Sequence, residues 1–193
     1  MWNLSFTPPE VIEARVWTRM PDALRRSVRS DWADANKPGH VVDCFLEGPS
    51  FDRAGNLYVT DIPHGRIFKI TTGGDWHEVA NTGGWPNGIA IHQDGTLWVA
   101  DYRKGLLRIN PNSGAIETVL GHRNSESFKG INDLVLTVTA IAISPIKVKP
   151  ECITRPAVSI ACRPTANWTN CWQTLPAPMA LLWIPVEGSC SLR

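Results

Sequence analysis

Three side chains with oxygen ligands lie at matching positions along this chain of 193 residues. They are Glu47, Asn87 and Asn132, separated by 40 residues (47 to 87) and then by 45 (87 to 132). A carboxylate and amide oxygens gathered from separate parts of a chain suit a hard divalent cation. Calcium is the first candidate, magnesium and manganese accept the same ligands, and zinc also binds carboxylate oxygens. The spacing therefore predicts that these oxygens surround one site.

Each of these residues also has a simpler interpretation. Asn87 precedes a glycine, and Asn-Gly is more often a turn than a ligand, so a turn or channel-lining role is favoured there. Glu47 follows the alternating apolar residues Val42, Cys44 and Leu46 and precedes Gly-Pro, where the fold does not need a carboxylate. A ligand role is favoured for Glu47. For Asn132, which is followed by Asp133, a turn and a ligand role are evenly balanced.

The segments that carry these residues are repeats. Residues 47–61 and 87–101 align at an offset of 40, which places Gly55 on Gly95, Tyr58 on Trp98 and Asp61 on Asp101. Self-similarity at this period is typical of propellers and solenoids. Alternation of apolar and polar residues within each copy favours strands, and therefore propeller blades. Because Asp61 and Asp101 close equivalent strands, they are expected to accept turn amide hydrogens.

We therefore expect an all-β chain that forms an incomplete β-propeller, with two four-stranded blades and the start of a third. Residues 1–40 are a lead-in with a short helix near 21–26, and residues 41–135 are the partial propeller. Within it, alternation and turn glycines predict strands at 57–60, 66–70, 76–79, 88–91, 97–100, 106–109 and 115–120. The repeat is lost from about residue 136, so residues 136–193 are expected to be an unrelated, irregular or disordered tail.

Composition narrows the classes of function. The chain is 43% hydrophobic and 19% charged, and its net charge of +1 gives no electrostatic footprint for nucleic acid or an anionic membrane. No run of about 18 apolar residues is present, and the N-terminus lacks the basic start and apolar core of a secretory signal. A cytoplasmic location is the resulting expectation.

The repeats resemble the family of senescence marker protein, gluconolactonase and luciferin-regenerating enzyme. The resemblance rests on Leu46-Glu-Gly-Pro-Ser-Phe-Asp52, on Trp85-Pro-Asn-Gly-Ile-Ala90 and on Gly130-Ile-Asn-Asp-Leu134, in this order. It implies a six-bladed propeller with one divalent metal on its axis and hydrolysis of sugar lactones and related cyclic esters. By the same resemblance, Glu47 matches a metal-ligand glutamate and Asn132 an asparagine near metal and substrate, while the role of Asn87 is less constant.

The resemblance ends before the family's later ligands. The aspartate expected to act as base has no counterpart in this chain, so the catalytic residue is unassigned. The sequence thus predicts a metal-dependent lactone hydrolase that is truncated and inactive alone, with a small-molecule lactone as its partner. The alternative is a non-catalytic propeller fragment that binds an ion or a partner. Exposed blade edges would allow either to self-associate.

Overall fold

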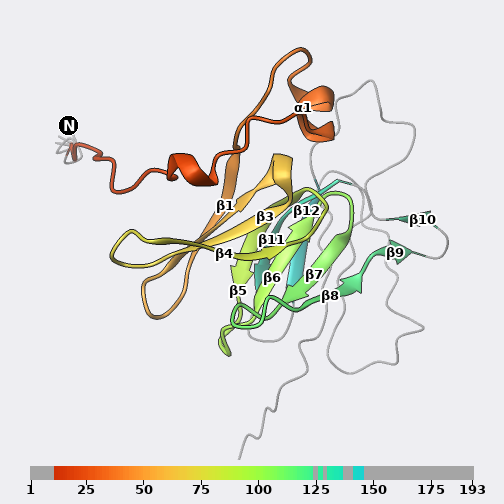
Figure 1. The fold of residues 1–193 in the computed structure, drawn as a ribbon. Coiled ribbons are helices and arrows are strands. Elements are labelled where there is room, and N and C mark those ends of the chain that lie inside the picture. Colours follow the sequence, from red (N-terminus) through yellow and green to blue (C-terminus); the bar gives the residue numbers. More distant parts are fainter. Residues whose placement is uncertain (1–10, 124–125, 128–129, 137–140, 146–193) are drawn as a thin grey trace, which may run out of the picture.

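A computed structural model describes residues 11–123, 126–127, 130–136 and 141–145. Two four-stranded antiparallel sheets dominate the part of the chain that it describes (Figure 1). The first blade consists of β1 (Leu46–Phe51), β2 (Leu57–Asp61), β3 (Arg66–Ile70) and β4 (Trp76–Asn81). The second consists of β5 (Pro86–Ile91), β6 (Leu97–Asp101), β7 (Gly105–Ile109) and β8 (Ile116–Leu120). Each blade follows the chain order, with every strand beside the one before it.

A third sheet begins the next blade. Its strands are β11 (Ile131–Leu136) and β12 (Ile141–Pro145), which pair antiparallel, while β9 (His122–Arg123) and β10 (Glu126–Ser127) form a short ribbon before them. The fold is therefore an incomplete β-propeller, as the repeat predicts. β12 lies within the segment that the sequence assigns to the tail, and residues 146–193 of that segment lie outside the described residues.

Turn chemistry explains why the two blades have the same form. Gly55 (φ +83°) and Gly95 (φ +88°) occupy the equivalent β1–β2 and β5–β6 turns, where a left-handed backbone favours glycine. In the first of these turns the Asp52 carboxylate accepts the backbone N–H groups of Ala54 and Asn56, both at 2.9 Å. These local bonds fix the length of the turn and therefore the register of the strands that it joins.

The blades pack through alternating side chains, which point to opposite faces of each sheet. Leu97 and Val99 face the first blade, where they contact a buried cluster that includes Tyr58 and Ile67. Trp98 faces the third sheet and packs with Ile131. Trp98 therefore has a packing role, and a large part of the core lies in the two layers between successive sheets.

The lead-in covers the remaining face of the first blade. Met20 is 4% exposed and packs against Val59, Phe68 and Ile70. The predicted short helix near 21–26 is a single 3₁₀ turn, η1 (Asp22–Leu24), which directly follows this contact.

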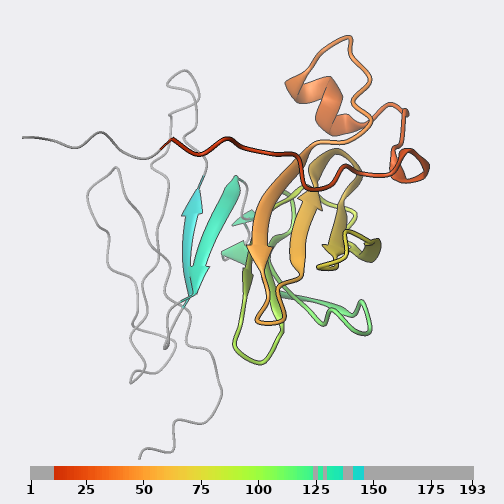
Figure 2. The same ribbon diagram turned by 90° about the vertical axis from the view of Figure 1, so that its left-hand side faces the viewer.

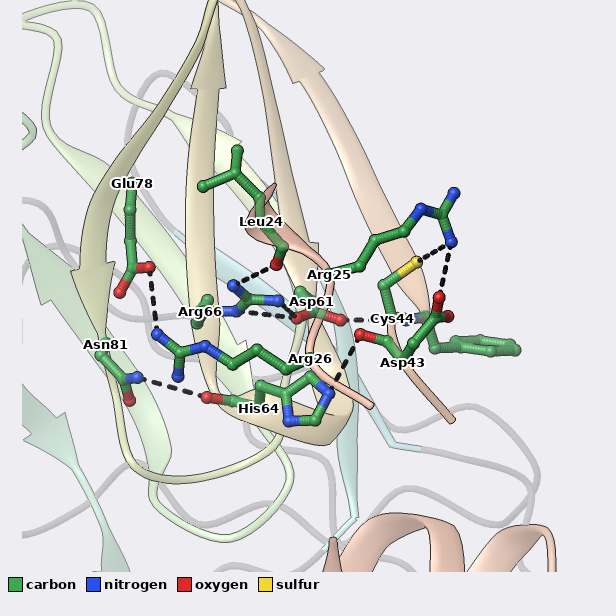
Figure 3. Close-up of polar contacts among 11 residues, drawn as sticks. Leu24, Arg25, Arg26, Asp43, Cys44, Asp61, His64, Arg66, Glu78 and Asn81 are labelled. Carbon is green, nitrogen blue, oxygen red and sulfur yellow. Dashed lines mark hydrogen bonds and ion pairs between the residues drawn. The ribbon is translucent and has the colours of Figure 1, made fainter. Parts of the chain in front are cut away.

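A buried arginine fixes this lead-in. The Arg66 guanidinium donates to the Asp61 carboxylate at 2.6 Å and to the Leu24 carbonyl at 2.7 Å (Figure 3). Nearby, Arg25 donates to Asp43 at 2.9 Å, and this hydrogen bond, against the opposing effect of burial, lowers the pKa of the Asp43 carboxyl below its ordinary value.

A helix that the sequence reading missed, α1 (Asp31–Asn36), lies beyond the end of the sheets at which β1 starts (Figures 1 and 2). Ser30 caps it, because its hydroxyl accepts the Ala33 N–H. The helix buries Trp32 and Ala33 against Ile62. At six residues, α1 depends on this packing rather than on its own propensity.

The first strand starts later than the sequence pattern suggests. Val42, Cys44 and Leu46 alternate as residues of a strand do, yet β1 begins only at Leu46. The preceding residues pack in two different places instead, Val42 beside α1 and Cys44 beside Met20. None of the helices among the described residues has the length and apolar character to cross a bilayer.

Candidate functional site

The three predicted site residues occupy one structural position. Glu47, Asn87 and Asn132 are each the second residue of the first strand of their sheet. These first strands are neighbours, because β5 contacts both β1 and β11. The offset of 40 and then 45 residues therefore corresponds to a real structural repeat.

Glycines allow these strands to approach closely. A Cβ atom on Gly48 would lie 2.1 Å from the backbone oxygen of Asn87, and one on Gly88 would lie 2.5 Å from Oδ1 of Asp133. No side chain fits at either glycine without a shift of the neighbouring strand. Glu47 and Asn87 are thus carried on backbones that touch.

The strands are also irregular at this point. Pairing with the second strand shifts between Glu47 and Ser50 in the first sheet, and between Pro86 and Ile89 in the second. The third sheet shifts between Ile131 and Asp133. Bulges of this kind re-aim side chains and are frequent beside functional sites. Each predicted site residue lies at or next to such a shift.

The structure brings the two amides into direct contact. Nδ2 of Asn87 donates to Oδ1 of Asn132 at 2.6 Å, and both residues are half-buried. Glu47 is exposed to solvent at the start of the adjacent strand. The arrangement offers one carboxylate and a pair of linked amides at one end of three adjacent strands.

These oxygens have the chemistry of a hard-cation site. Carboxylate and amide oxygens are ligands for calcium, magnesium and manganese. Among the described residues, no group of three or more His, Cys, Asp or Glu side chains is placed to hold a metal. A metal bound beside Glu47 would therefore need amide oxygens among its ligands.

The two repeated aspartates serve the fold. Oδ1 of Asp101 accepts the backbone N–H groups of Trp85, Arg103 and Lys104 at 2.9–3.0 Å, and its Oδ2 accepts the Thr82 hydroxyl at 2.8 Å. The expected role in holding turn amides is confirmed for Asp101.

Asp61 makes the equivalent bond to the backbone. Its Oδ1 accepts the Phe45 N–H at 2.9 Å. Its other oxygen accepts from Arg66 instead of from turn groups. Neither aspartate is available as a ligand.

Aromatic residues lie on the segments that lead to the same end of the sheets, and the sequence analysis assigned them no role in the site. The rings of Trp85 and Tyr102 have centroids 5.4 Å apart, and the Arg103 guanidinium lies 4.3 Å from the Trp85 centroid. Trp32 of α1 lies 4.9 Å from Phe45. Phe45 and Trp85 each precede a predicted site residue by two positions, and this spacing is the signal that could have found them.

An open hollow of about 460 Å³ lies at the opposite end of β1 and β5. It lies between the two equivalent turns and is lined by Phe51, Asp52, Arg53, Ala54, Ile91, His92, Gln93, Asp94 and Gly95. The hollow contains none of the predicted site residues.

Comparison with known families decides the relationship. The model of the SMP-30/gluconolactonase/LRE-like region matches residues 45–139, which include every strand from β1 to β11. This region belongs to the SMP-30/gluconolactonase/LRE-like family. The resemblance seen in the three sequence motifs is thereby confirmed. A comparison with curated protein sequences finds no match.

Several solved structures are similar to the chain. One is a gluconolactonase from Xanthomonas campestris, with 19% identity over 53% of this chain and 35% of that one, and a TM-score of 0.48. A virginiamycin B lyase from Staphylococcus aureus has 19% identity over 54% and 36% of the two chains, with a TM-score of 0.44. A streptogramin B lyase has 24% identity over 54% and 35%, with a TM-score of 0.44. The matching part spans about 35% of the length of these proteins.

Proposed function

We propose that the chain forms part of a metal-dependent lactone hydrolase, in which Glu47 and Asn132 hold a divalent cation and Asn87 lines the site. Calcium is the first candidate, with magnesium, manganese and zinc as alternatives. The observation that carries the proposal is the 2.6 Å bond between Asn87 and Asn132, made at equivalent positions of neighbouring strands beside Glu47. Membership of the gluconolactonase-like family supports the choice of a lactone. The cytoplasmic location stays a prediction.

Asn87, Asn132 and Glu47 have different roles in binding the cation. Asn87 donates to one lone pair of the Asn132 carbonyl oxygen, which leaves the second lone pair for a cation. This bond also fixes the orientation of the Asn132 amide. Glu47 supplies negative charge from the neighbouring strand. A cation bound there would polarise a lactone carbonyl and stabilise the oxyanion that develops on it.

The described residues do not supply the whole catalytic set. Calcium takes roughly 6–8 oxygen ligands, and this end of the sheets provides one carboxylate besides the amides. Asp61 and Asp101 already accept hydrogen bonds in the interior, so neither is placed to take a proton from water. We therefore propose that the chain binds metal and lactone but is inactive alone.

The single carboxylate also favours a second function. A non-catalytic fragment that binds an ion, or a partner through that ion, would need no protein ligands besides Glu47 and the amide pair, because water can complete the coordination. The two functions differ in whether the metal and a cyclic carbonyl compound bind together.

Calorimetric titration separates these functions. Calcium, manganese and zinc are titrated into the purified chain, with and without δ-valerolactam, a cyclic amide that mimics the lactone carbonyl and is not hydrolysed. If the carbonyl binds the metal, the lactam must tighten metal binding and the metal must tighten lactam binding by the same factor. That coupling supports the hydrolase, whereas metal binding without coupling assigns the chain to the second function.

Glu47→Gln is the decisive variant, because it removes the charge and keeps the shape. We expect at least a tenfold loss of metal affinity. Glu13→Gln makes the same chemical change at an exposed position of the lead-in and should leave affinity unchanged. Equal metal affinities of the wild type and Glu47→Gln would contradict a metal site formed by these three strands. Metal-dependent hydrolysis by the chain alone would contradict its proposed inactivity.

A further inference from the structure

We propose that Phe45, Trp85 and Tyr102 form an aromatic wall beside the candidate metal site, and that this wall selects lactones that carry a flat apolar ring over polyhydroxylated sugar lactones. This inference rests on the proposed function, because it names the substrate class of the same site. It is carried by the position, stacking and exposure of these three rings.

The backbone places the wall next to the predicted ligands. Phe45 lies two residues before Glu47, and Trp85 two residues before Asn87. The Tyr102 N–H donates to the Trp85 carbonyl at 2.9 Å, and the Tyr102 carbonyl accepts the Gly130 N–H at 3.2 Å, two residues before Asn132. Tyr102 thus joins the chain segments that lead into β5 and β11.

Stacking holds the rings in place. The Trp85 and Tyr102 rings are tilted by 36°, with centroids 5.4 Å apart, and the Arg103 guanidinium lies over Trp85 at 4.3 Å. Phe45 stacks on the buried Trp32 ring at 4.9 Å. Rings that are already ordered lose little conformational freedom when a ligand binds.

Parts of these rings remain accessible. Phe45 is 36% exposed, and Trp85 and Tyr102 are half-buried. Gly130 lies beside the Tyr102 ring, since a Cβ atom there would be in van der Waals contact with it at 3.8 Å. The wall therefore offers apolar area to a ligand beside Glu47 and Asn132.

Several polar side chains on the segments that carry or contact these rings already have partners. Arg103 donates to Asp31 of α1 at 3.2 Å, the Asn36 amide donates to the Trp32 carbonyl at 2.9 Å, and Arg25 donates to Asp43. A ligand with many hydroxyl groups would place them against aromatic carbon, where each hydroxyl that loses its water without a new partner opposes binding. A flat apolar ring has no such penalty and gains stacking.

The test compares two lactams by saturation-transfer NMR on the full chain with calcium present. One is the benzo-fused δ-lactam 3,4-dihydroquinolin-2-one, and the other is the lactam of gluconic acid. We expect the benzo-fused lactam to bind at least tenfold more tightly. Trp85→Leu should abolish the preference and Trp85→Phe should retain most of it. Trp17→Leu, at an exposed tryptophan of the lead-in, is the matched control.

The outcomes separate this inference from the proposed function. Equal affinities, or tighter binding of the gluconic lactam, would overturn the aromatic selection while leaving metal binding by Glu47 intact. A preference that survives in Trp85→Leu, with circular dichroism showing a folded chain, would also overturn it. Loss of the preference in that variant with unchanged calcium affinity supports it. If calcium does not bind but the preference holds, the metal proposal fails and the ring selection stands.

Discussion

At the scale of single residues, the equivalent buried aspartates of the two blades have different hydrogen-bond partners. Asp61 and Asp101 are equivalent and fully buried, yet Asp101 is satisfied by turn amides and a threonine hydroxyl, whereas Asp61 binds Arg66. Position 106, equivalent to Arg66, is a leucine. The arginine is needed only in the first blade, because there it also binds the Leu24 carbonyl of the lead-in.

Arg66→Met should be strongly destabilising. It leaves the buried Asp61 carboxylate without its cation, and breaking one side of a buried pair costs about 3–5 kcal/mol. Arg108→Met is the matched control, because Arg108 pairs with Glu117 at the surface, where the expected loss is below about 1 kcal/mol. Urea unfolding of both variants measures the difference. Similar losses would show that the Asp61–Arg66 pair contributes no more than a surface pair.

A second prediction concerns the close approach of β1 and β5. Gly48→Ala would place a Cβ 2.1 Å from the Asn87 oxygen, so the strands must separate. Gly95→Ala also forces a positive φ but meets no atom within 4 Å, so it should cost only the conformational penalty of about 1–2 kcal/mol. We expect Gly48→Ala to lower stability more than Gly95→Ala in urea unfolding and, unlike it, to weaken metal binding. The same loss of stability in both would mean that the contact is not strained.

Most of the candidate site could be predicted from the repeat alone. The matching positions of Glu47, Asn87 and Asn132 follow from the repeat, at offsets of 40 and then 45 residues, and the structural role of Asp101 follows from the first of these offsets. The Leu24 partner of Arg66 and the stacking of Phe45 on Trp32 could not be predicted, because both depend on how the lead-in folds back on the blades. Periodicity carries no information about such contacts.

At the scale of elements, the lead-in behaves as a substitute for a neighbouring blade. Leu97 and Val99 pack on the first blade, while the equivalent Leu57 and Val59 pack on the lead-in segment around Met20. The same pattern explains why β1 starts only at Leu46. Val42 and Cys44 alternate as residues of a strand do, but they pack in two separate clusters, one around Trp32 and one around Met20.

Strand positions were well predicted because each strand is bounded by local signals. The β3 prediction agrees with the observed Arg66–Ile70, and the others differ by up to two residues at either end. α1 was not predicted because its six residues make fewer than two helical turns, too few for a helical repeat of apolar residues to be recognised. Its available signals were the Ser30 cap and the acids Asp31 and Asp34 in its first turn.

The lead-in contact predicts a further stability effect. Met20→Ala removes a buried side chain from the cluster around Phe68 and should cost roughly 2–5 kcal/mol. Ile12→Ala removes apolar atoms from the same lead-in, but Ile12 is 81% exposed and the change should be near zero. Thermal or urea unfolding measures both. A negligible effect of Met20→Ala would mean that the lead-in is not part of the cooperative unit.

At the scale of the whole molecule, the described sheets leave apolar area on the third sheet. Val135 on β11 is 61% exposed. Exposed sheet surfaces and edges favour association. The self-association expected from the sequence therefore stays a prediction, and Val135 is a residue at which it can be tested.

We expect sedimentation velocity to show association that increases with protein concentration. Val135→Lys should weaken it, because a charge opposes burial of that surface. Val16→Lys, at another exposed valine in the lead-in, should leave it unchanged. A monomer at all concentrations, or equal effects of the two lysines, would contradict association through the third sheet.

The lead-in covers the outer face of the first blade, so the two ends of the stack of sheets differ. A circular arrangement needs its first and last members to meet, and here Met20 and Leu24 lie on the surface where that meeting would occur. An additional sheet, from this or another molecule, can add beside β11 and β12 without disturbing any described contact. Addition at the other end first requires the Arg66–Leu24 bond to break. We therefore expect any further sheet to add beside β11 and β12, because the lead-in covers the opposite end.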